Sequence, residues 1–369
     1  MSDNNEYRII ISGGGTGGHI FPAIAIADAL SQQLSHANIL FVGAKGRMEM
    51  EKVPQAGYDI RGLDVVGFQR GKIMDNLFFP FKLLKSLWAA FLIIRNFSPQ
   101  IVIGVGGYAS GPTLFIAALL RIPTVIQEQN YYPGVTNKIL ARVVQKIFVA
   151  YKGMDKFFPA EKIIYTGNPV RSSITGLPDK EVALHTLGWN GDKMTVFVMG
   201  GSLGARTIND SIKPFISTFI QNDIRLIWQT GKLYYNNIIK EIGDIPGSIK
   251  IFEFIEDMNV CYAAADIIIS RAGALSISEL CIVGKPTLLV PSPNVAEDHQ
   301  THNAMALVQQ HAAMMIKDVD AQSQLMPTLM DVLSDKNLQQ TLSLHLHKLA
   351  MPDANNEIAT HIIKILRSR

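Results

Sequence analysis

The hydrophobic positions of this chain gather in short runs, each followed by glycine or another turn residue and then by a helical pattern. Apolar runs this continuous indicate strands that are buried on both faces of a sheet. Strands that alternate with helices predict parallel sheets joined by right-handed crossovers. The runs lie at 9–11, 39–42, 101–105, 124–126, 196–199, 267–269 and 287–290.

The pattern starts again near residue 194. Residues 194–201 read MTVFVMGG and echo residues 7–14, which read YRIIISGG. A chain of 369 residues is long enough for two such domains. Gly167 and Pro169 interrupt both kinds of element between the two series and predict a hinge within 165–171. We therefore predict an α/β fold with two doubly wound, Rossmann-like domains. A helical pattern at 353–369 follows the second domain, and the pattern alone does not assign it to either domain.

Composition narrows the class of protein. Hydrophobic residues make up 48% and charged residues 18%, which excludes a disordered or fibrous chain. A net charge of +3 gives no general reason to expect a nucleic-acid partner. Cys261 and Cys281 form neither a C-x-x-C pair nor a disulfide framework, which fits a reducing cytoplasm. The polar start of the chain lacks an apolar export segment, so we expect an intracellular protein.

Three glycine-rich loops follow predicted strands. They are GGGTGGH at 13–19, GVGGYASG at 104–111 and GGSLGA at 200–205. Glycines let a backbone approach a phosphate closely, and the amides at the following helix start stabilise its charge. Each loop alone is also compatible with a tight strand-to-helix turn. Together they predict a cleft between the domains that holds a diphosphate.

The first loop also matches G-x-G-x-x-G, which raises a nicotinamide-dependent dehydrogenase as an alternative. That function requires an acidic residue at the end of the second strand to hold a ribose. Here the strand at 39–42 ends in Gly-Ala-Lys-Gly, so the alternative loses support.

Two residues beside these loops are candidates for chemistry. His19 closes the first loop and is either a general base or a structural hydrogen-bond donor. Glu279 lies in the segment SRAGALSISE, where its carboxylate either binds a sugar diol or completes a capping box with Ser276.

Two motifs contain residue types that can bind a metal ion. His299 and His302 lie in DHQTH, and Asp318 and Asp320 form D-x-D. Neither motif has further ligands nearby, so we expect no metal and no other cofactor. We interpret the first as a polar loop and the second as a solvated strand end.

The segment 61–95 combines six basic residues with a helical stretch rich in large apolar side chains. Phe81, Leu84 and Trp88 lie on one apolar arc, with Lys82, Lys85 and Ser86 on the other side. This is either a helix that faces the core or one that docks on an anionic membrane surface. The lysines disfavour a membrane-spanning helix at 77–94, so we expect none.

The ordered motifs of the whole chain resemble one family closely. They are GGGTGGHIFP, GVGGYASGP, EQN, TGNPVR, GGSLGAR, FIEDM, SRAGALSISEL and DHQTHNA. This set is similar to MurG, the family of N-acetylglucosaminyltransferases that convert lipid I to lipid II in peptidoglycan synthesis. The resemblance implies a GT-B fold. It also implies an acceptor domain at 1–168 together with the helix 353–369, and a UDP-GlcNAc-binding domain at 169–352.

The resemblance further implies roles for individual residues. Expected donor contacts are Arg171, Ser202, Ile255, Ala274, Leu275, Ser276, Ile277, Ser278, Glu279 and Gln300, with Glu279 on the ribose and Ile255 on the uracil. Thr16, Gly17, Gly18 and Asn130 are expected to face the sugar and diphosphate from the first domain. His19 is the leading candidate for the base, with Tyr108, Glu128 and Asn137 in support. Many relatives carry histidine where this chain has Gln127, which cannot act as a base.

The implied reaction is inverting transfer of GlcNAc from UDP-GlcNAc to the C4 hydroxyl of MurNAc in lipid I. The implied place is the cytoplasmic side of the cell membrane, with anionic lipids and other cell-wall synthesis proteins as expected partners. A UDP-GlcNAc 2-epimerase of the same fold and a non-catalytic nucleotide-sugar binding module stay open beside it.

Overall fold

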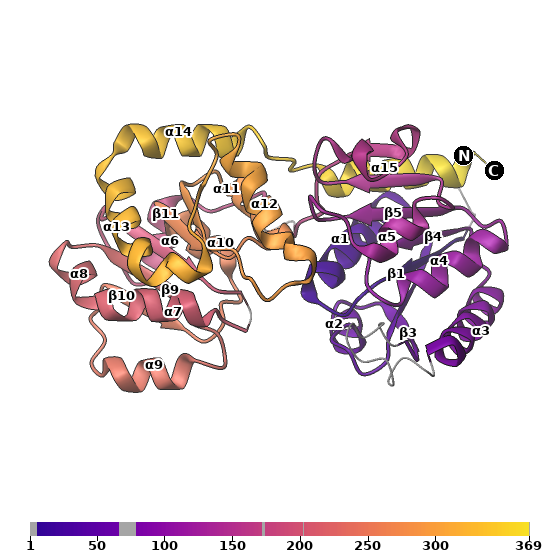
Figure 1. Cartoon of the computed structure of the whole chain (residues 1–369), viewed down its shortest axis with the longest axis horizontal. Coiled ribbons are helices and arrows are strands. Elements are labelled where there is room, and N and C mark those ends of the chain that lie inside the picture. Colours follow the sequence, from indigo (N-terminus) through magenta and orange to yellow (C-terminus); the bar gives the residue numbers. More distant parts are fainter. Residues whose placement is uncertain (1–5, 66–78, 172–173, 202, 369) are drawn as a thin grey trace. The chain divides into compact units, whose positions relative to one another are not determined.

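The structure, a computed structural model, describes residues 6–65, 79–171, 174–201 and 203–368. The chain divides into two compact units, Met1–Val170 with Pro352–Arg369, and Arg171–Met351. Each unit holds one parallel sheet with helices on both faces (Figure 1). The division falls inside the stretch 165–171 where glycine and proline interrupt the pattern, and the C-terminal helix returns to the first unit.

The first unit is built on a seven-stranded sheet of order β3-β2-β1-β4-β5-β6-β7. Its strands are β1 (Tyr7–Ser12), β2 (Ala37–Ala44), β3 (Asp59–Leu63), β4 (Ile101–Gly104), β5 (Thr124–Glu128), β6 (Lys146–Val149) and β7 (Ile163–Tyr165). Its helices are α1 (Gly17–Gln33), α2 (Glu49–Gln55), α3 (Phe79–Phe97), α4 (Ser110–Leu119), α5 (Val135–Leu140) and α15 (Ala354–Arg367).

The second unit is built on a six-stranded sheet of order β10-β9-β8-β11-β12-β13. Its strands are β8 (Thr195–Met199), β9 (Arg225–Gln229), β10 (Ile249–Phe252), β11 (Ile267–Ser270), β12 (Thr287–Leu289) and β13 (Met314–Met315). Its helices are α6 (Lys180–Thr186), α7 (Arg206–Ile212), α8 (Ile216–Gln221), α9 (Tyr235–Ile242), α10 (Met258–Ala264), α11 (Ala274–Val283), α12 (His299–Val308), α13 (Ala321–Ser334) and α14 (Lys336–His347).

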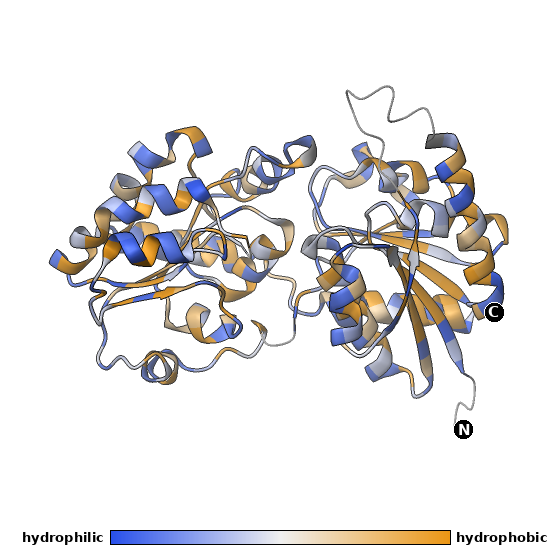
Figure 2. Cartoon of the chain, turned by 90° about the horizontal axis from the view of Figure 1, so that it is seen from below, coloured by the Kyte–Doolittle hydropathy of each residue, from blue (hydrophilic) through white to orange (hydrophobic). Residues whose placement is uncertain are grey.

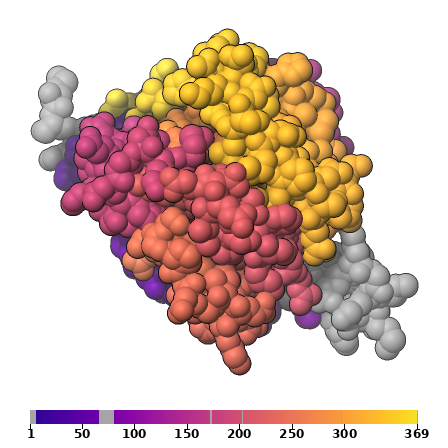
Figure 3. Space-filling view, turned by 90° about the vertical axis from the view of Figure 1, so that its left-hand side faces the viewer, coloured from indigo at the N-terminus to yellow at the C-terminus, as the bar shows by residue number. Residues whose placement is uncertain are grey.

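Both faces of each sheet are buried, as the continuous apolar runs predict. In the first unit α1 and α15 cover one face, while α3, α4 and α5 cover the other. In the second unit α6, α10, α11 and α14 pack on one face, and α7 and α13 on the other. Figure 2 shows the strands largely in the hydrophobic colour, whereas the helices carry mixed colours. At the surface seen in Figure 3, segments in magenta and in yellow, which are far apart in the sequence, lie side by side.

In each sheet, the first strand along the chain lies between the second and the fourth: β1 lies between β2 and β4, and β8 lies between β9 and β11. In such sheets ligands bind beyond the carboxyl ends of the strands, at the point where the strand order reverses. That point lies between β1 and β4 in the first unit, where Ser12 pairs with Gly104. It lies between β8 and β11 in the second, where Met199 pairs with Ser270. The glycine loops at 13–19, 104–111 and 200–205 all leave the sheets at these two points.

Helix α3 packs on the sheet through residues that lie outside the predicted apolar arc. Ser86, Ala90 and Ile94 are buried against the sheet, and the Ser86 hydroxyl donates to the carbonyl of Asp64 at 2.7 Å. Phe81 and Trp88 are 72% and 63% exposed. The interpretation of the arc as a core-facing surface is therefore wrong, because small residues on the other side of the helix allow it to lie close to the sheet. Within the described residues, no helix combines the length and apolarity needed to cross a membrane.

Candidate active site

The first glycine loop is bonded to an acid of the first unit. The carboxylate of Glu49, on the first turn of α2, accepts from the Gly15 amide at 2.8 Å and from the Ala44 amide at 2.9 Å. Glu49 is 1% exposed. One amide that the sequence offers to a phosphate is thus occupied by the chain's own anion. The same carboxylate lies next to the end of β2, where its Oε1 accepts from the Ala44 amide.

His19 lies on the first turn of α1, beside this loop. Its Nδ1 is 3.1 Å from the carbonyl oxygen of Gly14 and 3.4 Å from the Thr16 hydroxyl. The second glycine loop touches both groups: a Cβ on Gly106 would lie 2.8 Å from the His19 ring, and one on Gly107 would lie 2.3 Å from the Gly14 carbonyl oxygen. Gly106 and Gly107 also have φ values of 93° and 84°. These glycines are required for close packing of the two loops around His19.

The supporting residues of the first unit have different surroundings. Glu128 is buried, and its carboxylate accepts from the amide N–H groups of Asn130 and Gly134 and from the side chains of Asn130 and Asn137. With these donors bound, the carboxylate fixes the loop after β5. Tyr108 is 56% exposed on the second glycine loop.

Gln127 belongs to a buried amide network. Its side chain donates to Asn168 at 2.9 Å and accepts from Gln129, which also donates to the carbonyl of Val105 at 2.8 Å. These bonds tie the ends of β4 and β5 to the segment before the second unit. The position is structural in this chain.

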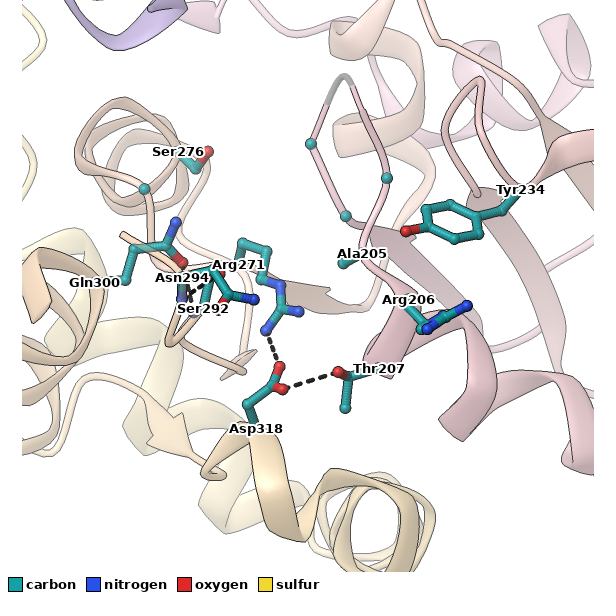
Figure 4. A pocket seen from close by; sticks show the side chains of 14 residues that line it. Ala205, Arg206, Thr207, Tyr234, Arg271, Ser276, Ser292, Asn294, Gln300 and Asp318 are labelled. Atoms are coloured by element: carbon teal, nitrogen blue, oxygen red, sulfur yellow. Dashed lines mark hydrogen bonds and ion pairs between the residues drawn. The ribbon is translucent and has the colours of Figure 1, made fainter. Parts of the chain in front are cut away.

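The second unit contains a cavity of about 480 Å³ at the carboxyl ends of its central strands. Two turns form its walls: the glycine loop between β8 and α7, and the start of α11 (Figure 4). Its lining includes Gly200, Gly201, Gly204, Ala205, Arg206, Thr207, Tyr234, Arg271, Gly273, Ser276, Ser292, Asn294, Gln300 and Asp318. Of the expected donor contacts, Ser276 and Gln300 line this cavity.

Helix α11 begins at Ala274, so its N-cap is Gly273, which has no side chain to cap the first amides. Ser276 and Glu279 therefore both lie inside the helix, and the capping-box interpretation is wrong. Gln300 holds the neighbouring loops, because its Oε1 accepts from the amides of Ala272 at 3.2 Å and Ser292 at 2.8 Å. Since both partners are donors, its NH₂ group must point elsewhere, and Figure 4 shows it beside the cavity.

Arg271 and Asp318 were not among the expected contacts. The Arg271 guanidinium donates to the carbonyls of Val290 and Pro291 and to Asp318, which also accepts from Thr207 at 2.8 Å (Figure 4). Asp318 is largely buried, so the interpretation of D-x-D as a solvated strand end is wrong. It ties a 3-10 turn to β11 and α7. In the described part of the chain, no group of three or more histidine, cysteine or acidic side chains is arranged to hold a metal ion.

Glu279 is bonded by two side chains of the second unit. Arg171 donates to its Oε1 from two nitrogens at 3.1 Å, and the buried hydroxyl of Tyr262 donates to its Oε2 at 3.0 Å. Burial raises the pKa of the Glu279 carboxyl above its ordinary value, against the opposing effects of Arg171 and Tyr262. The carboxylate is held in one orientation at the side of α11.

Four of the remaining expected contacts divide into three groups. The Ile255 amide donates to the Gln229 side chain at 2.9 Å. The carbonyl of Ile255 is therefore the backbone group left to bind a uracil base. Ile277 is buried in the core and the Ser278 hydroxyl bonds the carbonyl of Ala274, so neither side chain faces the cavity. Ser202 lies outside the described residues, as do the basic residues Arg70 and Lys72.

Comparison with known proteins identifies both units. Residues 9–149 match the glycosyltransferase family 28 N-terminal domain, and residues 195–358 match its C-terminal domain. The fold and these two domains define a glycosyltransferase of the GT-B type.

Relatives narrow this class to one family. A UDP-N-acetylglucosamine–N-acetylmuramyl-(pentapeptide) pyrophosphoryl-undecaprenol N-acetylglucosamine transferase of Bacteroides thetaiotaomicron is 53% identical and covers 98% of each chain. The enzyme of the same name from Parabacteroides distasonis is 54% identical over 98% of this chain and 99% of its own. The chain belongs to this family, the MurG family.

Solved structures agree with the sequence relatives. The crystal structure of MurG from Acinetobacter baumannii is 29% identical, with a TM-score of 0.80 over 97% of this chain and 99% of its own. A structure described as a UDP-N-acetylglucosamine 2-epimerase from Listeria monocytogenes is 13% identical, with a TM-score of 0.69 over 99% of this chain and 98% of its own. At that identity the likeness concerns the fold alone.

Proposed function

We propose that this chain transfers GlcNAc from UDP-GlcNAc to the C4 hydroxyl of MurNAc in lipid I and forms the β-1,4 bond of lipid II. A single direct displacement at the anomeric carbon inverts the α-linked donor. The cavity at the strand-order reversal of the second unit carries this proposal, because it joins a glycine loop and an uncapped helix start with polar side chains. The donor binds in the second unit and the acceptor in the first.

The leaving diphosphate is stabilised without a metal in this proposal. The amides at the start of α11, which no side chain caps, and the helix dipole stabilise the negative charge that develops on the diphosphate. The NH₂ group of Gln300 adds a donor beside the same helix start, because its Oε1 is held by the Ala272 amide. The carbonyl of Ile255 accepts from uracil N3–H, and Glu279 accepts from the ribose diol.

The attacking hydroxyl must lose its proton, and His19 is the base that we assign. Its Nδ1 faces a carbonyl oxygen, which can only accept, so the neutral ring carries its proton on Nδ1 and its basic lone pair on Nε2. Glu128 instead positions the loop that carries Asn130.

A transfer assay tests the reaction. Purified protein is incubated with labelled UDP-GlcNAc and a short-chain lipid I analogue, and the product is isolated and its new linkage identified by NMR. A β-1,4-linked disaccharide is expected. Formation of UDP-ManNAc without acceptor would support an epimerase instead, and binding of UDP-GlcNAc without any product would support a binding module.

We also propose that the first unit docks on the cytoplasmic surface of the cell membrane, where the acceptor is anchored. Helices α3, α4 and α5 pack side by side and expose large apolar side chains. These are Phe81, Leu84, Trp88 and Leu92 on α3, Phe115 and Leu119 on α4, and Val135 and Ile139 on α5. Exposed Lys82 adds positive charge that attracts anionic lipids, and exposed Lys85 beside it forms an ion pair with Asp64 at 3.3 Å.

The double substitution Leu84→Ser and Trp88→Ser should weaken binding to phosphatidylglycerol vesicles by at least about tenfold. Each large side chain contributes roughly 1.5–3 kcal/mol when it leaves water fully. Cosedimentation measures the bound fraction, and Leu344→Ser, an exposed residue of α14, is the matched control. Equal binding of the double variant and the native protein would refute this docking surface. Because the vesicles contain no protein, the assay separates lipid from protein partners.

A further inference from the structure

Glu49 is a buried acid with no assigned role in the reaction. A Cβ on Gly14 would lie 2.2 Å from its Oε1, and a Cβ on Gly43 would lie 2.5 Å from its Cγ. Both glycines therefore give space to this side chain. Its two oxygens each accept from one backbone amide, those of Gly15 and Ala44. The carboxylate is therefore fixed between the first glycine loop and the end of β2.

The peptide unit between Gly14 and Gly15 is bonded at both ends. Its N–H donates to Glu49 Oε2 at 2.8 Å, and its carbonyl oxygen is 3.1 Å from His19 Nδ1. Hydrogen bonds in series polarise one another, so a carboxylate on the N–H side strengthens the carbonyl as an acceptor. The carboxylate and the imidazole are thus connected through a single peptide group.

We propose that Glu49 is a positioning residue that acts through the Gly14–Gly15 peptide unit and holds His19 in the tautomer with the proton on Nδ1. Nε2 is then the basic atom. This inference rests on the proposed function, in which His19 removes the acceptor proton. In this arrangement Glu49 orients the base as a carboxylate orients histidine in a hydrolase triad, with a peptide group placed between them.

The packing around the ring supports this role. Gly106 lies against the opposite edge of the imidazole, where a Cβ would be 2.9 Å from Nε2. A rotated ring would lose the Gly14 carbonyl, and a reoriented Gly14–Gly15 peptide would leave the Glu49 carboxylate without one of its donors. The two glycine loops and Glu49 therefore define one ring orientation together.

The tautomer can be measured directly. Protein labelled with ¹⁵N in its histidines is examined by long-range ¹H–¹⁵N correlation, and His19→Gln assigns the His19 signals. The native protein should show a neutral ring protonated at Nδ1. In Glu49→Gln this signature should be lost or mixed with the Nε2–H form. Glutamine has a single acceptor oxygen, so its NH₂ group must face one of the two amide donors and cannot accept from it. An Nε2–H tautomer in the native protein would overturn the proposal even if the variant did not fold.

Kinetics separate positioning from a general loss of structure. Glu49→Gln should lower kcat roughly 10- to 100-fold, as loss of an orienting partner does elsewhere, while KM for UDP-GlcNAc stays within about twofold. Glu51→Gln, an exposed neighbour on α2, is the control and should behave as the native protein. A reduced kcat in Glu49→Gln with an unchanged His19 tautomer would overturn the positioning role. Native turnover in His19→Ala would instead refute the assignment of the base, and the measured tautomer would stand.

Discussion

Replacing His19 with alanine should lower kcat by about 10²- to 10⁴-fold, the usual contribution of a positioned general base. The affinity for UDP-GlcNAc should stay within about twofold, because His19 belongs to the first unit and the donor cavity to the second. Single-turnover transfer to a lipid I analogue measures the first quantity, and calorimetric titration with UDP-GlcNAc in the absence of acceptor measures the second.

Two further variants isolate the proton transfer. His19→Gln keeps an N–H that can donate to the Gly14 carbonyl but has no basic nitrogen, so its turnover should be as low as that of the alanine variant. His36→Ala changes an exposed histidine after α1 and should retain native turnover. Native turnover in His19→Ala would exclude His19 as the base and direct the search to another group of the first unit.

The sequence predicted the centre of each sheet better than its edges. All seven apolar runs became strands, and the restart at 194–201 became β8, which occupies the same position in its sheet as β1. Strands such as β9 and β10 escaped the pattern because charged residues interrupt them. Arg225 opens β9 and is buried, since its guanidinium donates to the carbonyls of Asn190 and Gly191 and stacks near Trp189. A partner far along the chain satisfies its charge, and no local pattern reveals it.

The same limit applies to the candidate site. Glycine spacing located the loops at both strand-order reversals, but it could not show which groups fill them. Glu49 occupies the first loop from α2, and Asp318 bonds Arg271 and Thr207 beside the second-unit cavity. Glu49 lies 34 residues from the Gly15 amide, and Asp318 lies 47 residues from the Arg271 guanidinium. Arg271 directly follows β11 and precedes the uncapped start of α11. This place in the chain is the feature of the sequence that indicates a residue of the site.

Glu279→Ala should weaken UDP-GlcNAc binding by about 2–3 kcal/mol, or roughly 30- to 150-fold, the range for losing hydrogen bonds to a charged group. The ribose diol loses its acceptor, and Arg171 loses the carboxylate that orients it. Calorimetric titration with UDP measures the effect. Tyr262→Phe is the matched control: it removes the hydroxyl on Oε2 but keeps the carboxylate, so its donor affinity should fall much less.

The raised pKa of Glu279 also predicts how the unfolding free energy of the native protein changes with pH. Burial raises the pKa of this carboxyl in the folded state, so at neutral pH its charge is a cost to folding. Relative to Glu279→Gln, the native protein should therefore gain unfolding free energy as the pH falls through the folded pKa toward the ordinary value of 4.5. Urea unfolding of both proteins across this range measures the difference. Weak donor binding by Glu279→Ala together with this pH dependence assigns the residue to the ligand, because a side chain kept for stability alone would show the opposite trend. Unchanged UDP affinity in Glu279→Ala would leave Glu279 as an anchor for Arg171 and remove it from the donor site.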